Sequence, residues 1–290
     1  MNILLTGGTG FIGGYVARRL RRAGHALHLV VRAPSAKPLG AEHVHDGTTE
    51  GLAAIVLAVA PDVVVHLASK FVVRHQPVDV APLVISNVLF GAQLLDAMQR
   101  AGVSRLVAAA TSWQQFESRP YSPVNLYAAT KQAFEAVAQY YVEALGFTTT
   151  FLALFDTYGP SDPRRKLLPL LLDATRTGKP IDVSPGDQLL DFVHVEDVAA
   201  AYEVAVRRQY DGQARGFERF AVSSGAPVSL RDLVLLLARV ARSAPAARLG
   251  VMPYRPREVM VPWNTGVPLP GWAPSISLEN GLSELVAGHV

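Results

Sequence analysis

Short apolar runs alternate with longer segments of helical periodicity through the first half of the chain. A short apolar run between polar residues is typical of a parallel strand buried on both faces. We therefore expect strands at residues 3–5, 27–31, 63–67, 106–109 and 149–154. The patterns between them predict helices at about 13–23, 51–59, 86–101 and 126–145. This alternation, with right-handed crossovers, predicts an α/β fold built on a doubly wound parallel sheet of the Rossmann type.

The rhythm breaks beyond Asp156, where prolines divide the chain. Helical patterns recur at 166–177 and at about 198–207, and the last third is rich in proline and predicted to be mainly loops. Because no long glycine-serine linker is present, we expect two lobes folded onto each other. The first comprises residues 1–157, to which 181–208 return; the remainder of 158–290 forms a smaller C-terminal lobe.

The composition mainly excludes certain classes of protein and of site. Half of the 290 residues are hydrophobic and 18% are charged. Charged residues or histidines interrupt the longest apolar stretches, so we expect no transmembrane helix and no membrane partner. A strand that begins at residue 2 leaves no room for a signal peptide, which favours a cytoplasmic protein. The absence of cysteine excludes disulfides and thiolate metal sites, and no metal is expected.

The formal net charge is only +3, although the sequence pI is about 9.2. Such an excess suits anionic small molecules, but without a basic stripe we expect no nucleic-acid partner. The one basic cluster is Arg18, Arg19, Arg21 and Arg22, near the end of the first predicted helix. Favourable charge at a helix C-terminus and a solvated face account for it better than a binding role.

A glycine-rich segment, Thr6-Gly-Gly-Thr-Gly-Phe-Ile-Gly13, joins the first predicted strand to the first predicted helix. Gly7 would allow a tight turn, Gly10 a close approach of the backbone to a pyrophosphate, and Gly13 close packing of helix on strand. The N–H groups and the positive dipole end of the following helix attract phosphates. The position of these glycines predicts a dinucleotide-binding site, which makes the first lobe a dinucleotide-binding domain and the second a candidate substrate-binding lobe.

Tyr127 and Lys131 lie one turn apart on a predicted helix, for which Asn125 is a plausible N-cap. A free tyrosine has a pKa of about 10, and we expect the neighbouring ammonium to lower it and so make the proton easier to exchange. Ser112 follows a predicted strand and is placed to hydrogen-bond the substrate oxygen that Tyr127 protonates; Thr111 is the weaker candidate. This order predicts an acid–base site above the ends of the strands.

With these residues in place, the chain resembles the extended short-chain dehydrogenases/reductases, the NAD-dependent epimerase/dehydratase family. The motifs that carry the resemblance are TGGTGFIG (6–13), DG (46–47), HLAS (66–69), Asn87, Ser112, YAATK (127–131), FDTYGP (155–160) and DFVHVEDVA (191–199). More narrowly, TSWQQF, PVNLYAATKQAFE and FDTYGPSDPRRKLLPLLL are similar to nucleotide-sugar 4-ketoreductases of the CDP-abequose synthase type.

The resemblance implies a role for each matching residue. The catalytic residues would be Ser112, Tyr127 and Lys131. The residues next to the nicotinamide cofactor would be Gly7, Gly10, Phe11, Ile12, Gly13, Arg32, Asp46, Gly47, Leu67, Ala68, Ser69, Tyr127, Lys131, Phe155 and Thr157. The substrate side would include Asn87, Ser112, Lys166 and Arg257, of which the last two would face the diphosphate, although a solvated surface explains those two equally well. Family members commonly dimerise through two helices, here about 86–101 and 126–145, so a homodimer is expected.

Three departures from the family pattern narrow the choice of activity. Arg32 ends the second predicted strand, where members that prefer NAD carry an acid, and its guanidinium would suit the 2′-phosphate of NADP. Trp113 and Gln114 follow Ser112 where 4,6-dehydratases carry Asp-Glu, so a dehydratase is disfavoured. Asp156 replaces a familiar asparagine, which puts any substrate contact by that asparagine in doubt.

The leading hypothesis is an NADPH-dependent reductase of the C4 ketone of a nucleotide-activated 4-keto-6-deoxyhexose or 3,6-dideoxyhexose. A nucleotide-sugar 4-epimerase with tightly bound NAD is the first alternative, because it would use the same residues. A non-catalytic NADP-binding regulatory protein is the second, although three intact catalytic residues argue against it.

Overall fold

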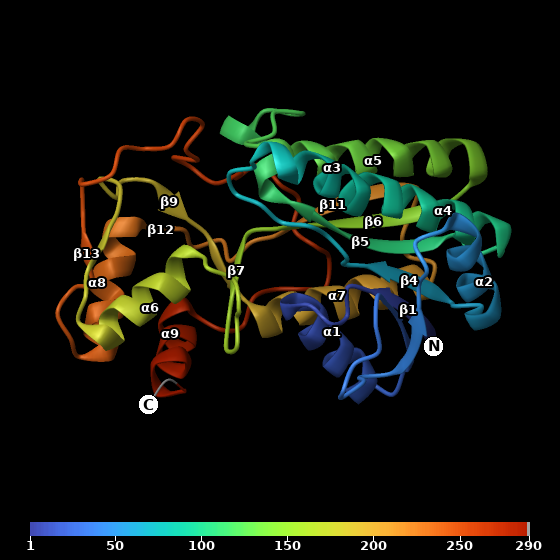
Figure 1. Cartoon of the computed structure of the whole chain (residues 1–290), viewed down its shortest axis with the longest axis horizontal. Coiled ribbons are helices and arrows are strands. Elements are labelled where there is room, and N and C mark those ends of the chain that lie inside the picture. The colour runs from blue at the N-terminus through green and yellow to red at the C-terminus, as the bar shows by residue number, and fades with distance from the viewer. Residues whose placement is uncertain (289–290) are drawn as a thin grey trace.

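The computed structural model describes residues 1–288, which form a larger lobe around a central sheet and a smaller lobe beside it (Figure 1). The sheet has seven parallel strands in the order β11-β6-β5-β4-β1-β2-β3. Their bounds are β1 (Asn2–Thr6), β2 (Ala26–Val31), β3 (Ala41–Val44), β4 (Val63–His66), β5 (Arg105–Thr111), β6 (Thr148–Leu154) and β11 (Phe217–Val222). The predicted doubly wound fold is confirmed, with the order reversing between β1 and β4, where such sheets bind ligands.

Five of the seven strands lie where the apolar runs predict them, and the two strands at the edges of the sheet were not predicted. Both end residues of β3, Ala41 and Val44, are exposed. The other edge strand, β11, carries Glu218 and Arg219 in its middle. An edge strand is buried on fewer sides, so its sequence lacks the continuous apolar run by which the inner strands are found.

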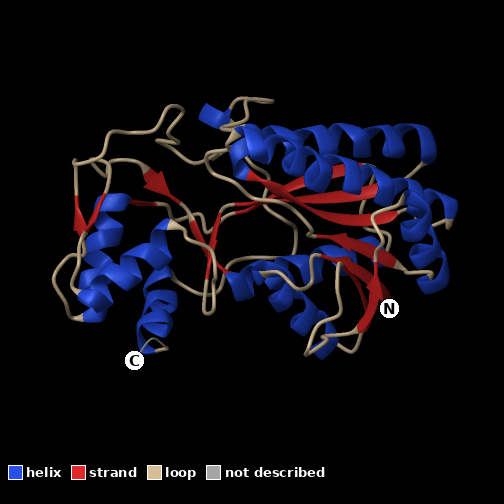
Figure 2. Ribbon diagram, viewed as in Figure 1, coloured by secondary structure: helices blue, strands red, loops and turns tan. Residues whose placement is uncertain are grey.

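Helices cover both faces of the sheet (Figures 1 and 2). On one face α2 (Thr49–Val59), α4 (Phe90–Arg100) and α5 (Leu126–Leu145) enclose a core that includes Val64, Phe134 and Phe151. On the other, α1 (Phe11–Arg22) and α7 (Val195–Tyr210) enclose a core with Leu29, Val65 and Tyr202. All the helices predicted in the first half of the chain are present, and α5 has the predicted bounds.

The helix at 86–101 begins earlier than predicted. A 3-10 turn, η1 (Pro77–Asp79), leads through α3 (Val80–Val84) and a π-helical turn, η2 (Ile85–Leu89), into α4. The whole run Pro77–Arg100 is long and apolar enough to cross a membrane by length and composition alone, a test that core helices also pass. Its second half packs in the core through Leu94, Leu95 and Met98. The exposed apolar side chains of the run, Val78, Val80, Val84, Ile85 and Leu89, all lie before α4.

The smaller lobe has its own apolar core, formed by leucines of α6 (Leu167–Thr177), α8 (Leu230–Ala241) and α9 (Leu278–Ala287). Short strand pairs flank it: β8 (Ile181–Asp182) with β13 (Ala247–Arg248), and β9 (Leu189–Leu190) with β12 (Val228–Ser229). A third pair, β7 (Asp156–Tyr158) with β10 (Phe192–His194), lies between the lobes in Figure 1.

The expectation that the last third is mainly loops is wrong for α8 and α9. Leu230, Leu233, Val234 and Leu237 repeat at helical spacing and are buried, and the Ser229 hydroxyl accepts from the Asp232 amide as an N-cap. Proline lies outside both helices, so the proline content of this segment describes the connections and not the helices.

Candidate active site

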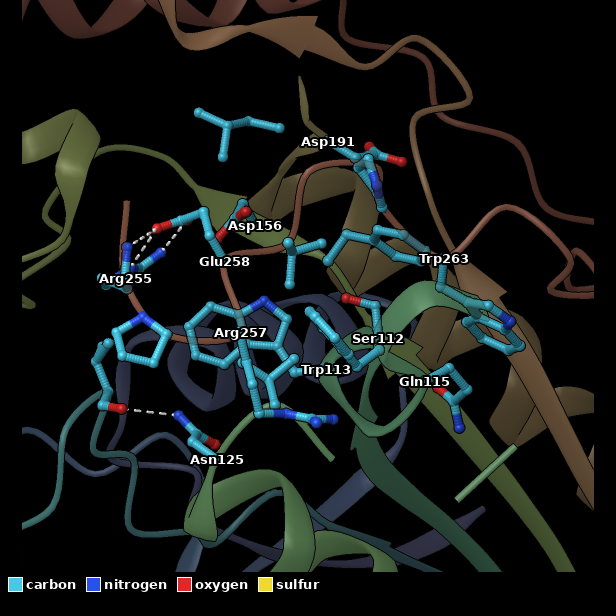
Figure 3. Close-up of a pocket in the computed structure, with 18 of the residues that line it drawn as sticks. Ser112, Trp113, Gln115, Asn125, Asp156, Asp191, Arg255, Arg257, Glu258 and Trp263 are labelled. Atoms are coloured by element: carbon cyan, nitrogen blue, oxygen red, sulfur yellow. Dashed lines mark hydrogen bonds and ion pairs between the residues drawn. The ribbon is translucent and has the colours of Figure 1, made fainter. Parts of the chain in front are cut away.

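Two neighbouring cavities open above the carboxyl ends of β4, β5 and β6. The first, of about 200 Å³, lies against the glycine-rich loop. The second, of about 360 Å³, extends towards the smaller lobe (Figure 3). Residues that line both are Ser112, Trp113, Phe155 and Asp156. A ligand in the first cavity can therefore meet a ligand in the second beside Ser112.

The glycine-rich loop has the shape that a pyrophosphate requires. Gly7 adopts φ +74°, and a Cβ there would run into the backbone of Leu67 and Ala68. A Cβ on Gly13 would clash with the carbonyl oxygen of Gly7, whereas one on Gly10 would meet only that oxygen, at 3.3 Å. Gly10 is also the N-cap of α1 and offers no side-chain acceptor to the first-turn amides. The loop therefore presents free N–H groups on a surface without side chains, which fits the diphosphate of a dinucleotide.

Tyr127 lies in the first turn of α5 because the helix is capped just before it. The Asn125 side chain accepts from the Ala128 amide at 3.0 Å and donates to the Val73 carbonyl at 2.9 Å. Tyr127 lines the first cavity, with the ring of Phe71 edge-on at 5.0 Å between centroids. The cap thus fixes the phenol at the mouth of the first cavity.

Burial raises the pKa of Tyr127 to about 12, against smaller opposing effects of the Ser69 hydroxyl and the Arg164 charge. The sequence predicted the opposite direction, through Lys131. Lys131 is 2% exposed, and burial lowers its own pKa to about 8, opposed by the charge of Glu135. Desolvation outweighs the effects of Ser69 and Arg164, so the phenol remains protonated at neutral pH and can act as a proton donor.

Ser112 opens a 3-10 turn, η3 (Ser112–Gln114), directly after β5. The Thr111 hydroxyl accepts from the Trp113 amide at 3.3 Å, and the Thr111 amide donates to Gln114 Oε1 at 2.9 Å. This capping leaves Ser112 facing both cavities, while Gln114 is fully buried. Thr111, the weaker candidate, is occupied as the cap of the turn, although it also borders the first cavity.

The structure brings most of the residues predicted for the cofactor together. Those that line the first cavity are Gly7, Gly10, Phe11, Ile12, Gly13, Leu67, Ser69, Tyr127, Phe155 and Thr157. Ala68 lies under Gly7, with its amide donating to Thr6 Oγ1 at 3.2 Å. Asp46 is exposed and accepts from the Thr48 amide and hydroxyl at the start of α2, and Gly47 lies in the same turn. Asp46 and Gly47 therefore shape this turn and do not line the described cavities.

Arg32 is exposed and lies outside the residues that line the cavities around the loop. A third cavity, of about 380 Å³, lies on the outer side of the glycine-rich loop and is lined by Arg18 and Lys37. Glu42, which also lines it, accepts from the Ser35 amide at 2.8 Å. The sequence placed Arg18 at a solvated helix end, and its position two turns into the helix after the glycines was the one sign of this location.

Of the residues expected on the substrate side, Ser112 and Arg257 line the second cavity, whereas Lys166 and Asn87 do not. Arg257 donates to Ser122 Oγ at 2.9 Å, with its guanidinium 4.2 Å from the ring centroid of Phe116. Lys166 lines the first cavity, 4.0 Å from Asp156 and 4.9 Å from the ring centroid of Phe71.

Asn87 is 1% exposed and reaches neither cavity. It accepts from the Ser69 hydroxyl and the Lys70 amide, and donates to the Lys70 carbonyl and to Thr130 Oγ1. These bonds tie the loop after β4 to α5. Asn87 therefore acts on the site by fixing the position of Ser69 and not by touching a ligand.

Several lining residues were not predicted. Arg255 pairs with Glu258 at 2.6 Å on the wall of the second cavity, beside Asp156 in Figure 3. Arg164 lies 4.6 Å from the ring centroid of Phe11 and donates to the Thr157 carbonyl at 2.8 Å. Trp263 lines the second cavity from the C-terminal third of the chain. The signal available in the sequence for the two arginines was the clustering of basic residues beside proline in 163–166 and 255–257.

Comparisons with known proteins agree with this geometry. The model of the NAD dependent epimerase/dehydratase family matches residues 3–218. The chain is 23% identical to CDP-abequose synthase of Salmonella typhimurium (strain LT2), over 98% of this chain and 97% of the relative. It is 27% identical to UDP-glucose 4-epimerase of Mycolicibacterium smegmatis, over 99% and 97%. The solved structure of MoeE5 in complex with UDP-glucose and NAD superposes with a TM-score of 0.83 at 26% identity, covering 99% of this chain and 98% of that chain.

Proposed function

The chain belongs to the NAD dependent epimerase/dehydratase family, and we propose that it reduces the C4 ketone of a nucleotide-activated 4-keto-6-deoxyhexose with NADPH. The observation that carries the proposal is the position of Ser112, which lines both the larger second cavity and the cavity against the glycine-rich loop that Tyr127 also lines. The likeness to CDP-abequose synthase supports a ketoreductase. A 3,6-dideoxy substrate fits the same chemistry at C4.

The chemistry needs one hydride and one proton. Gly7, Gly10 and Gly13 would hold the diphosphate of the cofactor, and a reduced nicotinamide bound in the first cavity would supply the hydride for C4. Tyr127 donates its phenolic proton to the carbonyl oxygen, which Ser112 holds by a hydrogen bond. The charge of Lys131 stabilises the phenolate that remains, and the ring of Phe71 shields the phenol from water. The buried Gln114 stands where elimination of water would need a carboxyl group, so the site supports reduction and not dehydration.

The third cavity supports NADPH as the reductant. Arg18 and Lys37 line it beside the first turn of α1, where they could pair with a 2′-phosphate. The same ribose in NAD has no anionic group to pair with them. This assigns the cofactor preference to Arg18 and Lys37 in place of Arg32.

We expect Arg18→Ala and Lys37→Ala each to raise the KM for NADPH about tenfold, the loss of one charge-assisted hydrogen bond, and to leave the KM for NADH nearly unchanged. Steady-state kinetics with both cofactors measures this. Arg22→Ala, an exposed arginine at the end of the same helix, is the control and should change neither value. Equal changes with the two cofactors would contradict the assignment.

The function itself is tested by mixing the protein with NADPH and each member of a panel of 4-keto-6-deoxy nucleotide sugars. The fall in NADPH absorbance measures the rate of oxidation, and we expect about one turnover per second or more. Oxidation with one member of the panel is the expected result, and it would identify the nucleotide at the same time. Absence of oxidation with every ketone would overturn the ketoreductase.

A nucleotide-sugar 4-epimerase is the second candidate, because a UDP-glucose 4-epimerase is as similar to the chain as the ketoreductase is. It would oxidise and re-reduce C4 with the same Tyr127 and Ser112. Co-purified NAD and interconversion of two sugars without net change of cofactor would establish it. Normal NADP binding with neither activity would support the other alternative, a non-catalytic NADP-binding regulatory protein.

A homodimer is also proposed, through the helices that family members use. Leu94 of α4 is fully buried in its own core, so α4 offers little apolar surface there. The exposed apolar residues Val84, Ile85 and Leu89 on α3 and η2 offer more. These residues support a dimer face at the start of the helical run, before α4.

A further inference from the structure

Glu135 is a buried carboxylate that the proposed mechanism does not use. It lies on α5 one turn beyond Lys131, and the two side chains are 5% and 2% exposed. Residues four apart on a helix share one face. A carboxylate buried beside an active site is unfavourable unless other groups compensate for its lost hydration.

The compensating groups come from two further elements. Arg219 on β11 donates to Glu135 Oε2 at 3.1 Å, and its side chain is only 27% exposed. The amide of Gln114 in η3 lies beside the carboxylate and stabilises its charged form. Burial raises the pKa of Glu135, while Arg219, Gln114 and Lys131 oppose that rise. Four side chains from α5, β11 and η3 therefore form one polar cluster within the core.

This cluster borders the second cavity in two places. The guanidinium of Arg219 lies 5.6 Å from the ring centroid of Trp263, which lines that cavity and stacks on Phe155 with 6.5 Å between centroids. Gln114 ends the turn that begins with Ser112. The cluster thus connects the lysine behind the cofactor cavity with residues that would touch the sugar.

We propose that Glu135, held by Arg219 and one helical turn from Lys131, is a positioning residue that keeps the Lys131 ammonium charged behind Tyr127. The proposal rests on the role given to Lys131 in the proposed function. It adds a reason for the largely buried pair that Arg219 of β11 forms with Glu135 of α5.

The other titratable groups around Lys131 do not replace Glu135. His66 on β4 is fully buried, and burial, with the Lys131 charge, lowers its pKa to about 3, so it is neutral. Tyr127, on the preceding turn of α5, is neutral because burial raises its pKa to about 12. The carboxylate of Glu135 is therefore the anion that opposes the effect of burial on Lys131.

Removal of Glu135 is expected to lower the pKa of Lys131. Burial alone lowers the pKa of a lysine, and an adjacent anion raises it. Without Glu135, Lys131 would lose its proton at lower pH and a smaller fraction of it would be charged near neutrality. Without Arg219, Glu135 would be harder to ionise, and Lys131 would shift in the same direction through it.

The test follows the ε-CH₂ resonances of the protein, uniformly labelled at lysine with ¹³C, by NMR as the pH is raised. The chain has five lysines, and Lys131→Arg assigns the relevant signal by removing it. We expect a midpoint of about 8 for Lys131 in the unaltered protein. Glu135→Gln should lower it by about one pH unit or more, and Arg219→Met by less. The double variant should match Glu135→Gln alone, because Arg219 acts through Glu135.

Glu143→Gln, an exposed carboxylate on the same helix, is the matched control and should leave the midpoint unchanged. An unchanged Lys131 midpoint in folded Glu135→Gln would overturn the proposal. If that variant does not fold, Glu135→Asp and Arg219→Met decide in the same way. This measurement needs no substrate, so it can fail while the ketoreductase stands, or succeed while the panel of ketones gives no turnover.

In the active enzyme the same variants should shift the alkaline limb of kcat to lower pH, with the KM for the sugar unchanged. A purely structural role would lower the melting temperature and leave the limb in place.

Discussion

Tyr127→Phe is expected to lose most of its turnover and to bind the cofactor as tightly as the unaltered protein. Phenylalanine keeps the edge-on contact with Phe71 and fills the same space, so only the hydroxyl is lost. Because burial raises the pKa of Tyr127 to about 12, that hydroxyl carries its proton throughout the physiological range. General acid catalysis commonly contributes about 10²- to 10⁴-fold, and we expect kcat to fall within that range.

The measurement pairs kcat for the ketone with the dissociation constant of NADPH from its fluorescence. Tyr140→Phe is the matched control, because Tyr140 lies on the same helix, is exposed and is remote from the cavities. It should be indistinguishable from the unaltered protein. A kcat for Tyr127→Phe within about threefold of that protein would remove Tyr127 from the proton-transfer step, since such a change is below the usual effect of a general acid.

The sequence predicts the inner strands of the sheet better than the edge strands, and the reason is physical. Inner parallel strands such as β5 must be apolar on both faces, and that demand is visible in any short stretch. In an edge strand such as β11, the charged side chains form ion pairs with residues of other elements. Glu218 lies 3.4 Å from Arg208, and Arg219 lies 3.1 Å from Glu135, contacts that no local pattern reveals.

The candidate site divides in the same way. The glycine-rich loop and the pair Tyr127 and Lys131 are local motifs, so their spacing alone predicts a shared cavity. The direction of the Tyr127 pKa was predicted wrongly because it depends on burial by segments far along the chain. The place of Arg18 beside Lys37 likewise depends on how the loop after β2 folds back over α1.

Gly13→Ala is expected to weaken cofactor binding strongly, although it adds one methyl group. The new Cβ would clash with the carbonyl oxygen of Gly7 and approach the Cα of Gly8, both of them backbone groups that cannot turn aside. Relief requires α1 to move away from the loop, and overpacking of this kind commonly costs about 1–3 kcal/mol. If that strain falls on the cofactor-binding conformation, the affinity for NADPH falls about 10- to 100-fold.

Gly14→Ala supplies the control from the adjacent position on the same helix. A Cβ there would make ordinary contacts with the end of the flexible Arg18 side chain, at 3.5 Å, and with the Gly8 carbonyl oxygen, at 3.9 Å. Gly14 also lines the third cavity, so the control is judged with NADH, which carries no 2′-phosphate and whose binding should change little. Fluorescence titration with NADPH and NADH compares the two variants, and thermal unfolding tests whether Gly13→Ala remains folded. A folded Gly13→Ala that binds NADH as tightly as Gly14→Ala would mean that the close contact of α1 with the glycine-rich loop is not what shapes the phosphate cradle. Loss of affinity in Gly13→Ala alone would place the pyrophosphate on the loop, where the free amides of the first turn of α1 are presented.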